Sequence, residues 1–303
     1  MNKVAFLFPG QGAQYVGMGK DIYDKSEIAK KYFDEVFAKL DIDLKDVLFD
    51  GPEDTLKQTM YTQPGIVLFS TVLVKLMEEK GITPEYVAGH SLGEYAALSA
   101  GKYLSVTDTV KLAELRGKIM TEVTENVDGA MAAIIGLDSS NIESICNGID
   151  GVVEAVNYNE PKQTVIAGER AAVEKACELL KEAGAKRALL LPVSGPFHSS
   201  LMKPAGEKLK ESLVSFEFEK SDIKLVANTT TEFLSDIEDI KEELYRQSFG
   251  PVKWVETMIK LKEAGVETFY EIGPGKVLKG LAKKIDKELN VINIEKYEDI
   301  ENL

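Results

Sequence analysis

The sequence predicts an α/β protein: a parallel β-sheet covered by helices on both faces, with a second α/β unit inserted into the chain. Three observations support this fold class. The run from Val4 to Phe8 is apolar throughout, which is typical of a strand buried on both faces of a parallel sheet. Segments of the same apolar character return late in the chain, at 223–229 and 268–273. Between them, residues 130–191 follow a different pattern that is complete in itself.

The first part of the chain reads as strand, turn and helices. Pro9 and Gly10 end the first strand. A long helix is expected over 62–81, with Pro64 near its first position and Gly81 at its end. A short strand follows at 86–89, then a helix of small residues over 93–101 and another helix over 106–124.

Residues 128–194 are predicted to form the inserted unit. Strands are expected at 130–136, 152–158, 163–168 and 186–192, and helices at 139–148 and 169–184. This order, βαββαβ, is the ferredoxin-like pattern and makes a complete two-layer unit. We therefore expect a ferredoxin-like subdomain at 128–194 and a discontinuous core made of 1–127 and 195–303.

Composition excludes several classes of protein. A formal net charge of −14 over 303 residues leaves no broad basic surface for a nucleic acid. Two cysteines are too few for a disulfide framework or a metal site. No segment reaches the roughly 18 uninterrupted apolar residues of a membrane span, and the first apolar run is too short for a signal peptide. We expect a cytoplasmic protein with no membrane or nucleic-acid partner.

The stretch "GHSLG" at 89–93 has the G-x-S-x-G spacing of a nucleophile elbow. A strand must turn sharply into a helix there, with Ser91 strained, and side chains two positions to either side would collide. The predicted strand before it and helix after it supply this context. The alternative is that Ser91 only caps the helix, with Glu94 completing a capping box. The context favours the nucleophile.

The chain has two histidines, so the candidates for a base are few. His90 precedes Ser91 on the strand side, where neighbouring side chains point to opposite faces, and we expect it to pack beneath the turn. His198 follows the last strand of the insert in an irregular loop and is the better candidate, because a serine hydroxyl needs a base. No motif identifies a group that orients this ring; an acid or a backbone carbonyl would serve.

Arg116 lies on the apolar face of the helix predicted at 106–124. It is flanked there at helical spacing by Leu112, Ala113, Ile119, Met120 and Val123. A cation on a core-facing stripe needs an anionic partner or several acceptors. Two interpretations stay open: a structural ion pair or outward-reaching side chain, and a bidentate clamp for a carboxylate on a substrate.

Taken together, these residues resemble the malonyl-CoA:acyl-carrier-protein transacylase family over essentially the whole chain. The segments that carry the resemblance are "FPGQGAQYVGMG" at 8–19, "TQP" at 62–64, "GHSLGEYAAL" at 89–98, "LRGKIM" at 115–120, "GAMAAIIGL" at 129–137, "SGPFHS" at 194–199 and "YRQSFGPVKW" at 245–254. The fold that this resemblance implies is an α/β-hydrolase-like core with a ferredoxin-like insert.

The resemblance also implies a reaction. A malonyl group from malonyl-CoA would form an ester on Ser91 and then pass to the phosphopantetheine thiol of acyl carrier protein, supplying extender units for fatty acid synthesis. No bound cofactor or metal is implied. The implied roles are His198 as base, the N–H groups of Gln11 and Leu92 as oxyanion hole, Arg116 as ligand of the malonyl carboxylate, the carbonyl of Gln247 as orienting group of His198, and Phe197, Gln63 and Met120 as further substrate-binding residues.

Two other classes of function compete with this one. A thioesterase or esterase would use the same elbow, but a hydrolase of neutral acyl groups has no use for Arg116. A non-catalytic scaffold that binds an acyl carrier would keep the fold without the chemistry. The presence of Ser91, His198 and Arg116 together argues against the scaffold.

Overall fold

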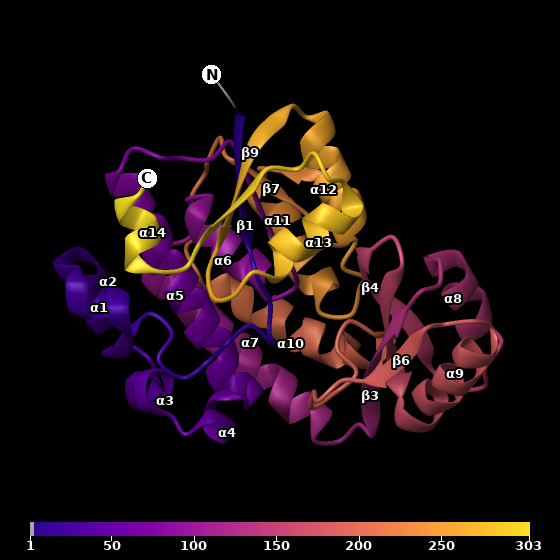
Figure 1. Ribbon diagram of the computed structural model, residues 1–303. Helices are drawn as coiled ribbons and strands as arrows, with labels where there is room; N and C mark the ends of the chain where they lie inside the picture. Colours follow the sequence, from indigo (N-terminus) through magenta and orange to yellow (C-terminus); the bar gives the residue numbers. More distant parts are fainter. Residues whose placement is uncertain (1–2) are drawn as a thin grey trace.

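The computed structural model describes residues 3–303, and its strands form two sheets (Figure 1). The larger sheet has the strand order β10-β9-β1-β2-β7-β8, and the smaller has the order β4-β5-β3-β6. In Figure 1 the smaller sheet lies to one side of the main body together with α8 and α9. The protein is thus a mixed α/β fold with a parallel-sheet core.

The strands of the larger sheet are β1 Lys3–Phe8, β2 Tyr86–Gly89, β7 Lys224–Val226, β8 Phe233–Leu234, β9 Val266–Ile272 and β10 Val291–Ile294. Those of the smaller sheet are β3 Gly129–Ile135, β4 Val153–Glu160, β5 Gln163–Glu169 and β6 Arg187–Leu190. The helices are α1 Lys20–Lys25, α2 Glu27–Phe37, α3 Leu44–Asp50, α4 Glu53–Leu56, α5 Thr59–Glu79, α6 Gly93–Ala100, α7 Val106–Thr124, α8 Ser139–Cys146, α9 Arg170–Glu182, α10 Lys203–Ser212, α11 Ile237–Gln247, α12 Trp254–Glu263, α13 Val277–Ile285 and α14 Tyr297–Glu301.

Strand β1 shows why its sequence is apolar at every position. Phe6 and Phe8 belong to the core that the sheet shares with α5, α6 and α7. Ala5 and Leu7 belong to a second core on the opposite face, beneath α12 and α13. Because β1 pairs in parallel with both β2 and β9, it is covered on both faces and along both edges. The expected parallel core of the sheet is confirmed, and β8 at its edge pairs antiparallel with β7.

The carboxyl ends of the parallel strands bring loops from distant parts of the chain to one edge of the sheet. β1 runs into the loop 9–19, and β2 runs into the stretch 89–93. Both strands are parallel and adjacent, so these two loops emerge side by side. In open parallel sheets this edge is where ligands bind.

Helix α5 starts earlier than the sequence indicated. Pro64 was expected near the first helical position, but the helix begins at Thr59 and carries Pro64 in its interior. The added turn packs against α7, where a Cβ on Gly117 would lie 3.0 Å from the Thr59 carbonyl oxygen. Tertiary packing therefore outweighs the one helical hydrogen bond that a proline removes.

The smaller sheet is antiparallel throughout, and its elements follow the order β3-α8-β4-β5-α9-β6. Alternate residues of β3 serve two cores. Ala132 and Ile134 pack under α8 and α9, whereas Met131 and Ala133 join the core of the larger sheet. Backbone hydrogen bonds between β4 and Val252 tie the two parts together at 2.7 and 2.9 Å.

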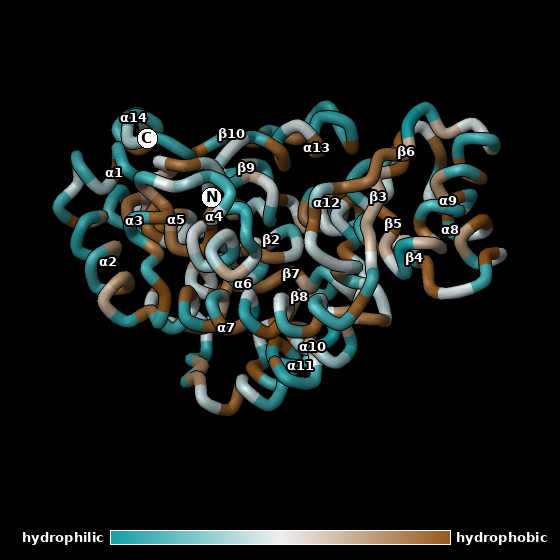
Figure 2. The backbone as a smooth tube through the Cα atoms, turned by 90° about the horizontal axis from the view of Figure 1, so that it is seen from below, coloured by the Kyte–Doolittle hydropathy of each residue, from teal (hydrophilic) through white to brown (hydrophobic). Residues whose placement is uncertain are grey.

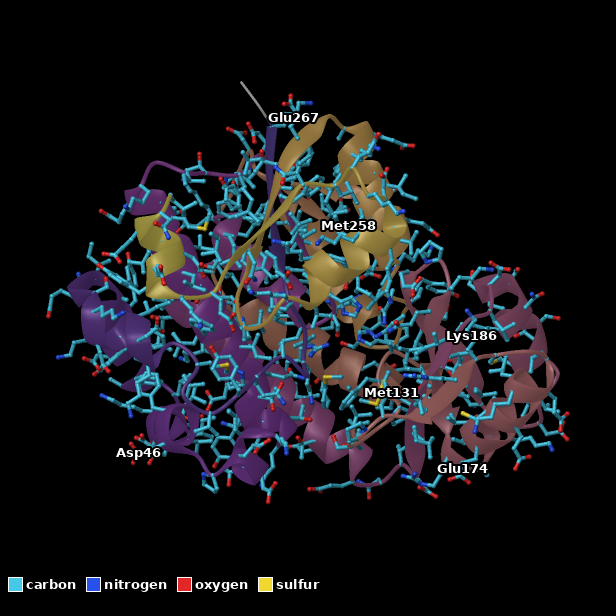
Figure 3. The ribbon with its side chains drawn as sticks, viewed as in Figure 1. Asp46, Met131, Glu174, Lys186, Met258 and Glu267 are labelled. Atoms are coloured by element: carbon cyan, nitrogen blue, oxygen red, sulfur yellow. The ribbon has the colours of Figure 1, made fainter. Side chains whose placement is uncertain are left out.

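Figure 2 shows brown, hydrophobic stretches along α5, a helix whose residues are mostly buried. Within residues 3–303, α5 is the one helix long and apolar enough to cross a membrane by length and composition, and 83% of its apolar window is buried in the protein. Charged side chains such as Glu174, Lys186 and Glu267 lie at the surface, while Met258 of α12 is buried (Figure 3).

Candidate active site

The turn from β2 into α6 is built on two glycines. A Cβ on Gly89 would lie 1.8 Å from the backbone carbon of Gly93, and a Cβ on Gly93 would lie 2.0 Å from the carbonyl oxygen of Phe8. Ser91, between them, has a φ of 52°, which non-glycine residues adopt rarely. The turn therefore has the close approach and the strained serine that define a nucleophile elbow.

Ser91 and His198 are in direct contact. The Oγ of Ser91 lies 2.6 Å from the Nε2 of His198. The Nδ1 of this ring lies 2.9 Å from the backbone carbonyl oxygen of Gln247 and 3.2 Å from that of Gly250. Since carbonyl oxygens only accept, Nδ1 carries the proton and Nε2 is free to accept one from the serine.

His198 is held neutral by its surroundings. Its side chain is almost fully buried and its backbone has a φ of 69°. Burial, followed by the positive charge of Arg116, lowers the pKa of His198 to about 3. A neutral imidazole with its acceptor nitrogen toward a serine hydroxyl is the arrangement that general-base chemistry requires.

His90 makes no hydrogen bond to Ser91 among the described residues. Its Nε2 lies 2.7 Å from the Oδ1 of Asn159, and its ring centroid lies 5.6 Å from that of Trp254. Burial lowers its pKa. His90 is thus held by Asn159, and its ring does not serve the Ser91 hydroxyl.

The alternative that Ser91 and Glu94 form a capping box is wrong. Helix α6 has Leu92 as its N-cap residue, and no side chain caps it. The carboxylate of Glu94 accepts instead from Asn228 and Gln247. A strained elbow leaves the serine side chain facing its base, so it cannot turn back to the helix N–H groups.

The loop after β1 contacts the elbow through Gly10. A Cβ at that position would lie 2.6 Å from the carbonyl oxygen of His90. In residues 3–303, the backbone N–H groups of Gln11 and Leu92 donate to no protein acceptor. Two free donors near a half-buried serine can stabilise a developing oxyanion.

Arg116 of α7 is 2% exposed yet makes no ion pair within the described chain: no carboxylate oxygen lies within 4.0 Å. Its Nη2 donates to the Oε1 of Gln247 at 3.2 Å, and its guanidinium carbon lies 4.9 Å from the ring centroid of Tyr95. Its Nε has no partner. Burial lowers its pKa. The interpretation as a structural ion pair is therefore not supported; the cation is buried with donors to spare.

The remaining predicted site residues lie on α5, on α7 and in the loop before His198. The Nε2 of Gln63 lies 3.4 Å from the sulfur of Met120 and 3.5 Å from the Oε1 of Gln11, while the Oε1 of Gln63 is buried without a partner. Phe197 is buried directly before His198. These contacts join α5, α7 and the loop after β1 into one wall.

Sequence reasoning missed Asn228, which follows β7. Its Oδ1 accepts from the N–H of Ser91 at 2.8 Å, and its Nδ2 donates to the carbonyl oxygen of Gly89 at 2.7 Å. Both bonds hold the elbow in its strained shape. The one available signal was a buried polar residue just beyond the carboxyl end of a predicted parallel strand.

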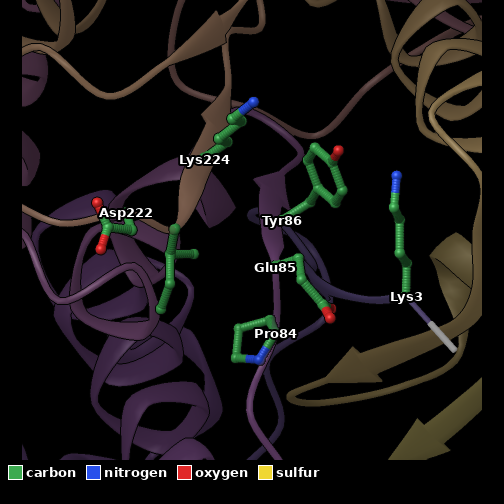
Figure 4. A pocket seen from close by; sticks show the side chains of 7 residues that line it. Lys3, Pro84, Glu85, Tyr86, Asp222 and Lys224 are labelled. Carbon is green, nitrogen blue, oxygen red and sulfur yellow. The ribbon is translucent and has the colours of Figure 1, made fainter. Parts of the chain in front are cut away.

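An open hollow lies at the other end of the sheet and is separate from this chemistry. It is formed near the starts of β1, β2 and β7, where Lys3, Glu85, Tyr86 and Lys224 line it (Figure 4). The elbow lies at the carboxyl end of β2, the opposite end of that strand. Neither Ser91 nor His198 lines this hollow.

Comparison with known proteins identifies the family of the chain. Residues 5–298 match the acyl transferase domain family. The malonyl CoA-acyl carrier protein transacylase of Bacillus subtilis (strain 168) is 44% identical over 304 residues, covering 99% of this chain and 96% of that protein. A malonyl-transacylase in complex with its type II polyketide synthase acyl carrier protein superposes with a TM-score of 0.95 at 40% identity, covering 99% and 98%. An acyl carrier protein S-malonyltransferase of Vibrio cholerae gives 0.95 at 41%, covering 99% of each.

Because the acyl transferase model matches residues 5–298, the chain belongs to the acyl transferase family. Within it, the identity over nearly its whole length places it among the malonyl CoA-acyl carrier protein transacylases.

Proposed function

We propose that this protein transfers a malonyl group from malonyl-CoA to the phosphopantetheine thiol of an acyl carrier protein, supplying extender units for fatty acid synthesis. One observation supports this substrate above all. Arg116 is buried without an ion-pair partner among the described residues, and hydrogen bonds through the Gln247 side chain connect it to Ser91. The guanidinium donates to the Gln247 side chain at 3.2 Å, and that side chain donates to the Ser91 carbonyl oxygen at 2.9 Å. A desolvated cation with free donors matches an acyl group that carries a carboxylate.

In the first half-reaction, Ser91 attacks the thioester. Its hydroxyl proton passes to the Nε2 of His198 while Oγ bonds to the malonyl carbonyl carbon. The N–H groups of Gln11 and Leu92 bind the oxyanion, and Arg116 binds the malonyl carboxylate. The carbon–sulfur bond then breaks, and the imidazolium returns its proton to the sulfur. Coenzyme A leaves as the thiol, and Ser91 holds malonate as an ester.

The second half-reaction reverses these steps with a different thiol. The phosphopantetheine thiol gives its proton to His198, its sulfur attacks the ester carbon, and Ser91 regains a proton as its oxygen leaves. The carbonyl oxygen of Gln247, 2.9 Å from Nδ1, stabilises the imidazolium in both halves. Phe197, Gln63 and Met120 line the acyl pocket in this proposal.

The same proposal extends to the architecture. We assign an α/β-hydrolase-like core to 1–127 and 195–303, and a ferredoxin-like subdomain to 128–194. Two features support the second assignment: the spatial strand order is β4-β5-β3-β6, and along the chain helix α8 follows β3 and helix α9 follows β5. We place the reaction in the cytoplasm.

Intact-protein mass spectrometry tests the function. The protein is mixed separately with malonyl-, methylmalonyl- and acetyl-CoA, and a malonyl adduct is expected that acyl carrier protein discharges faster than water does. Ser91→Ala should keep the fold and lose the adduct. An adduct that persists in Ser91→Ala refutes the nucleophile, and discharge by water alone makes the protein a hydrolase.

A further inference from the structure

The carboxyl group of Glu94 is completely buried three residues after the nucleophile. Its Oε1 accepts from the backbone N–H of Asn228 at 2.9 Å and from the side-chain amide of Asn228 at 3.2 Å. Its Oε2 accepts from the Nε2 of Gln247 at 2.6 Å. Within residues 3–303 no lysine or arginine lies within 4.0 Å of it. The reaction steps above give Glu94 no part, although a buried acid is costly to maintain.

Hydrogen bonding places a negative charge on Glu94. Burial raises the pKa of both Glu94 and the nearby Glu243; that of Glu94 is raised well above its usual value, and the charge of Glu243 adds to this rise, so the titrations of the two carboxyls are coupled. Glu243 contacts the hydroxyl of Thr229, which can accept a carboxyl proton. Every hydrogen-bond neighbour of the Glu94 oxygens is an N–H donor. Burial alone would favour the proton on Glu94, but none of the hydrogen-bond partners of Glu94 can accept a proton, whereas the Thr229 hydroxyl beside Glu243 can. The hydrogen bonds therefore assign the proton to Glu243 and the charge to Glu94.

The side chain of Gln247 lies between this acid and Arg116, and its orientation is determined by its neighbours. Its Oε1 accepts from Arg116, which can only donate. Its Nε2 donates both to Glu94 and to the carbonyl oxygen of Ser91, which can only accept. The Gln247 amide therefore presents a neutral oxygen to Arg116 and lies between Arg116 and the Glu94 carboxylate, so the two charges are not in direct contact.

We propose that Glu94 is a positioning residue for acyl-group selection: an indirect counter-ion that acts on Arg116 through the Gln247 amide. Its charge offsets the desolvation of the guanidinium, and its hydrogen bond holds Gln247 in the one orientation that faces oxygen toward Arg116. The cation stays charged and its remaining donors stay free for a carboxylate on the acyl group. The inference rests on the proposed role of Arg116.

The indirect arrangement matters because a direct partner would compete with the substrate. A carboxylate against the guanidinium would form a bidentate pair, and a malonyl carboxylate would have to displace it. A neutral amide oxygen contributes one weaker hydrogen bond and leaves the other N–H groups unpaired. Glu94 thus compensates the charge of Arg116 without occupying the N–H groups that a substrate carboxylate would bind.

The test measures acylation rates of Ser91 by malonyl-CoA and acetyl-CoA, with the ratio of the two as readout. Glu94→Gln removes the charge, and its NH2 group must face the N–H donors of either Gln247 or Asn228, so Arg116 loses its indirect counter-ion in either orientation. We expect the malonyl-to-acetyl ratio to fall at least tenfold, mainly through a higher KM for malonyl-CoA. A purely structural role would lower both rates alike, and an unchanged ratio overturns the proposal.

Three further variants test the proposal from other sides. Glu243→Gln removes the other buried acid and serves as the matched control, with an unchanged ratio expected. The exchange Glu94→Gln with Gln247→Glu keeps one carboxylate but moves it against Arg116, so the ratio should stay low; a ratio restored to the unmodified level overturns the proposal even if Glu94→Gln alone fails to fold. Arg116→Ala distinguishes a failure of the proposed role of Glu94 from a failure of the proposed role of Arg116. If Arg116→Ala leaves the malonyl-to-acetyl ratio unchanged, Arg116 does not bind the malonyl carboxylate.

Discussion

The Oγ of Ser91 and the Nε2 of His198 lie 2.6 Å apart although 107 positions separate the residues in the chain. Ser91 is presented by the turn between β2 and α6 of the larger sheet. His198 follows β6, the last strand of the smaller sheet, and is held from behind by the carbonyl oxygen of Gln247 at the end of α11. The reactive pair is thus assembled from both sheets and one helix end.

Removing this base should slow acylation of Ser91 by about 10³- to 10⁴-fold, a typical loss for a serine enzyme that keeps its oxyanion donors. The measurement is the single-turnover rate of malonyl transfer to His198→Ala. His90→Ala is the matched comparison, because that ring bonds to Asn159 rather than to Ser91. If the His90 variant folds and is the slower of the two, the base has been assigned to the wrong histidine.

The rate of acylation should not show the fall near pH 6.5 that protonation of an ordinary histidine would cause. A base with a pKa near 6.5 would be protonated at pH 5 and lose roughly 30-fold in rate. Burial lowers the pKa of His198 to about 3, so its ring stays neutral and the rate should stay level from pH 8 to pH 5. Stopped-flow acylation in this range checks it, and a limb near pH 6.5 speaks against the buried neutral ring.

Arg116→Ala should lower malonyl transfer by 10²-fold or more and leave acetyl transfer within a few-fold, since a charge-assisted pair contributes about 3 kcal/mol when desolvated. Arg116→Lys should recover only part of the loss, because a lysine cannot bind a carboxylate through two parallel N–H groups. Competition between the two acyl-CoAs, read by intact mass, measures both variants. Equal losses for the two acyl groups would return Arg116 to a purely structural role.

The elbow should not tolerate even one added methyl group. In Gly89→Ala the new Cβ would meet the backbone of Gly93 at 1.8 Å, so the strand and helix would have to separate. We expect a loss of several kcal/mol in the free energy of unfolding, beyond the range of ordinary surface changes. Gly184→Ala is a control with open space around it, though with a positive φ. Urea unfolding of both variants measures the free energy of unfolding, so that the steric contact in Gly89→Ala can be compared with the backbone strain alone in Gly184→Ala.

A buried acid outside the site should make stability fall as pH rises. Glu271, at the end of β9, accepts the N–H groups of Leu278 and Lys279, and burial raises its pKa to about 7. Because the folded pKa exceeds the unfolded value, its stabilising protonated form is present below pH 4.5 and is lost as pH approaches 7. The cost is up to about 3 kcal/mol. Glu271→Gln should flatten this slope in Tm between pH 5 and pH 8, and an unchanged slope would contradict it.

Local patterns were enough for the features that depend on neighbouring residues. An apolar run at 4–8, a helical stripe at 106–124 and the spacing of "GHSLG" each report a constraint a few residues long, and each has its counterpart in β1, α7 and the elbow. The start of α5 was placed wrongly because Pro64 reads locally as a helix start, whereas packing on α7 carries the helix back to Thr59.

The sequence by itself favoured a strained turn at Ser91 and placed Arg116 on the apolar face of a helix, because sterics and periodicity act along the chain. Tertiary structure decided which further side chains contact them. Asn228, Glu94 and Gln247 reach the site from three elements that only parallel pairing and helix packing bring together. Hydrogen-bond geometry and desolvation depend on those distances in space, so no pattern in the chain could specify them.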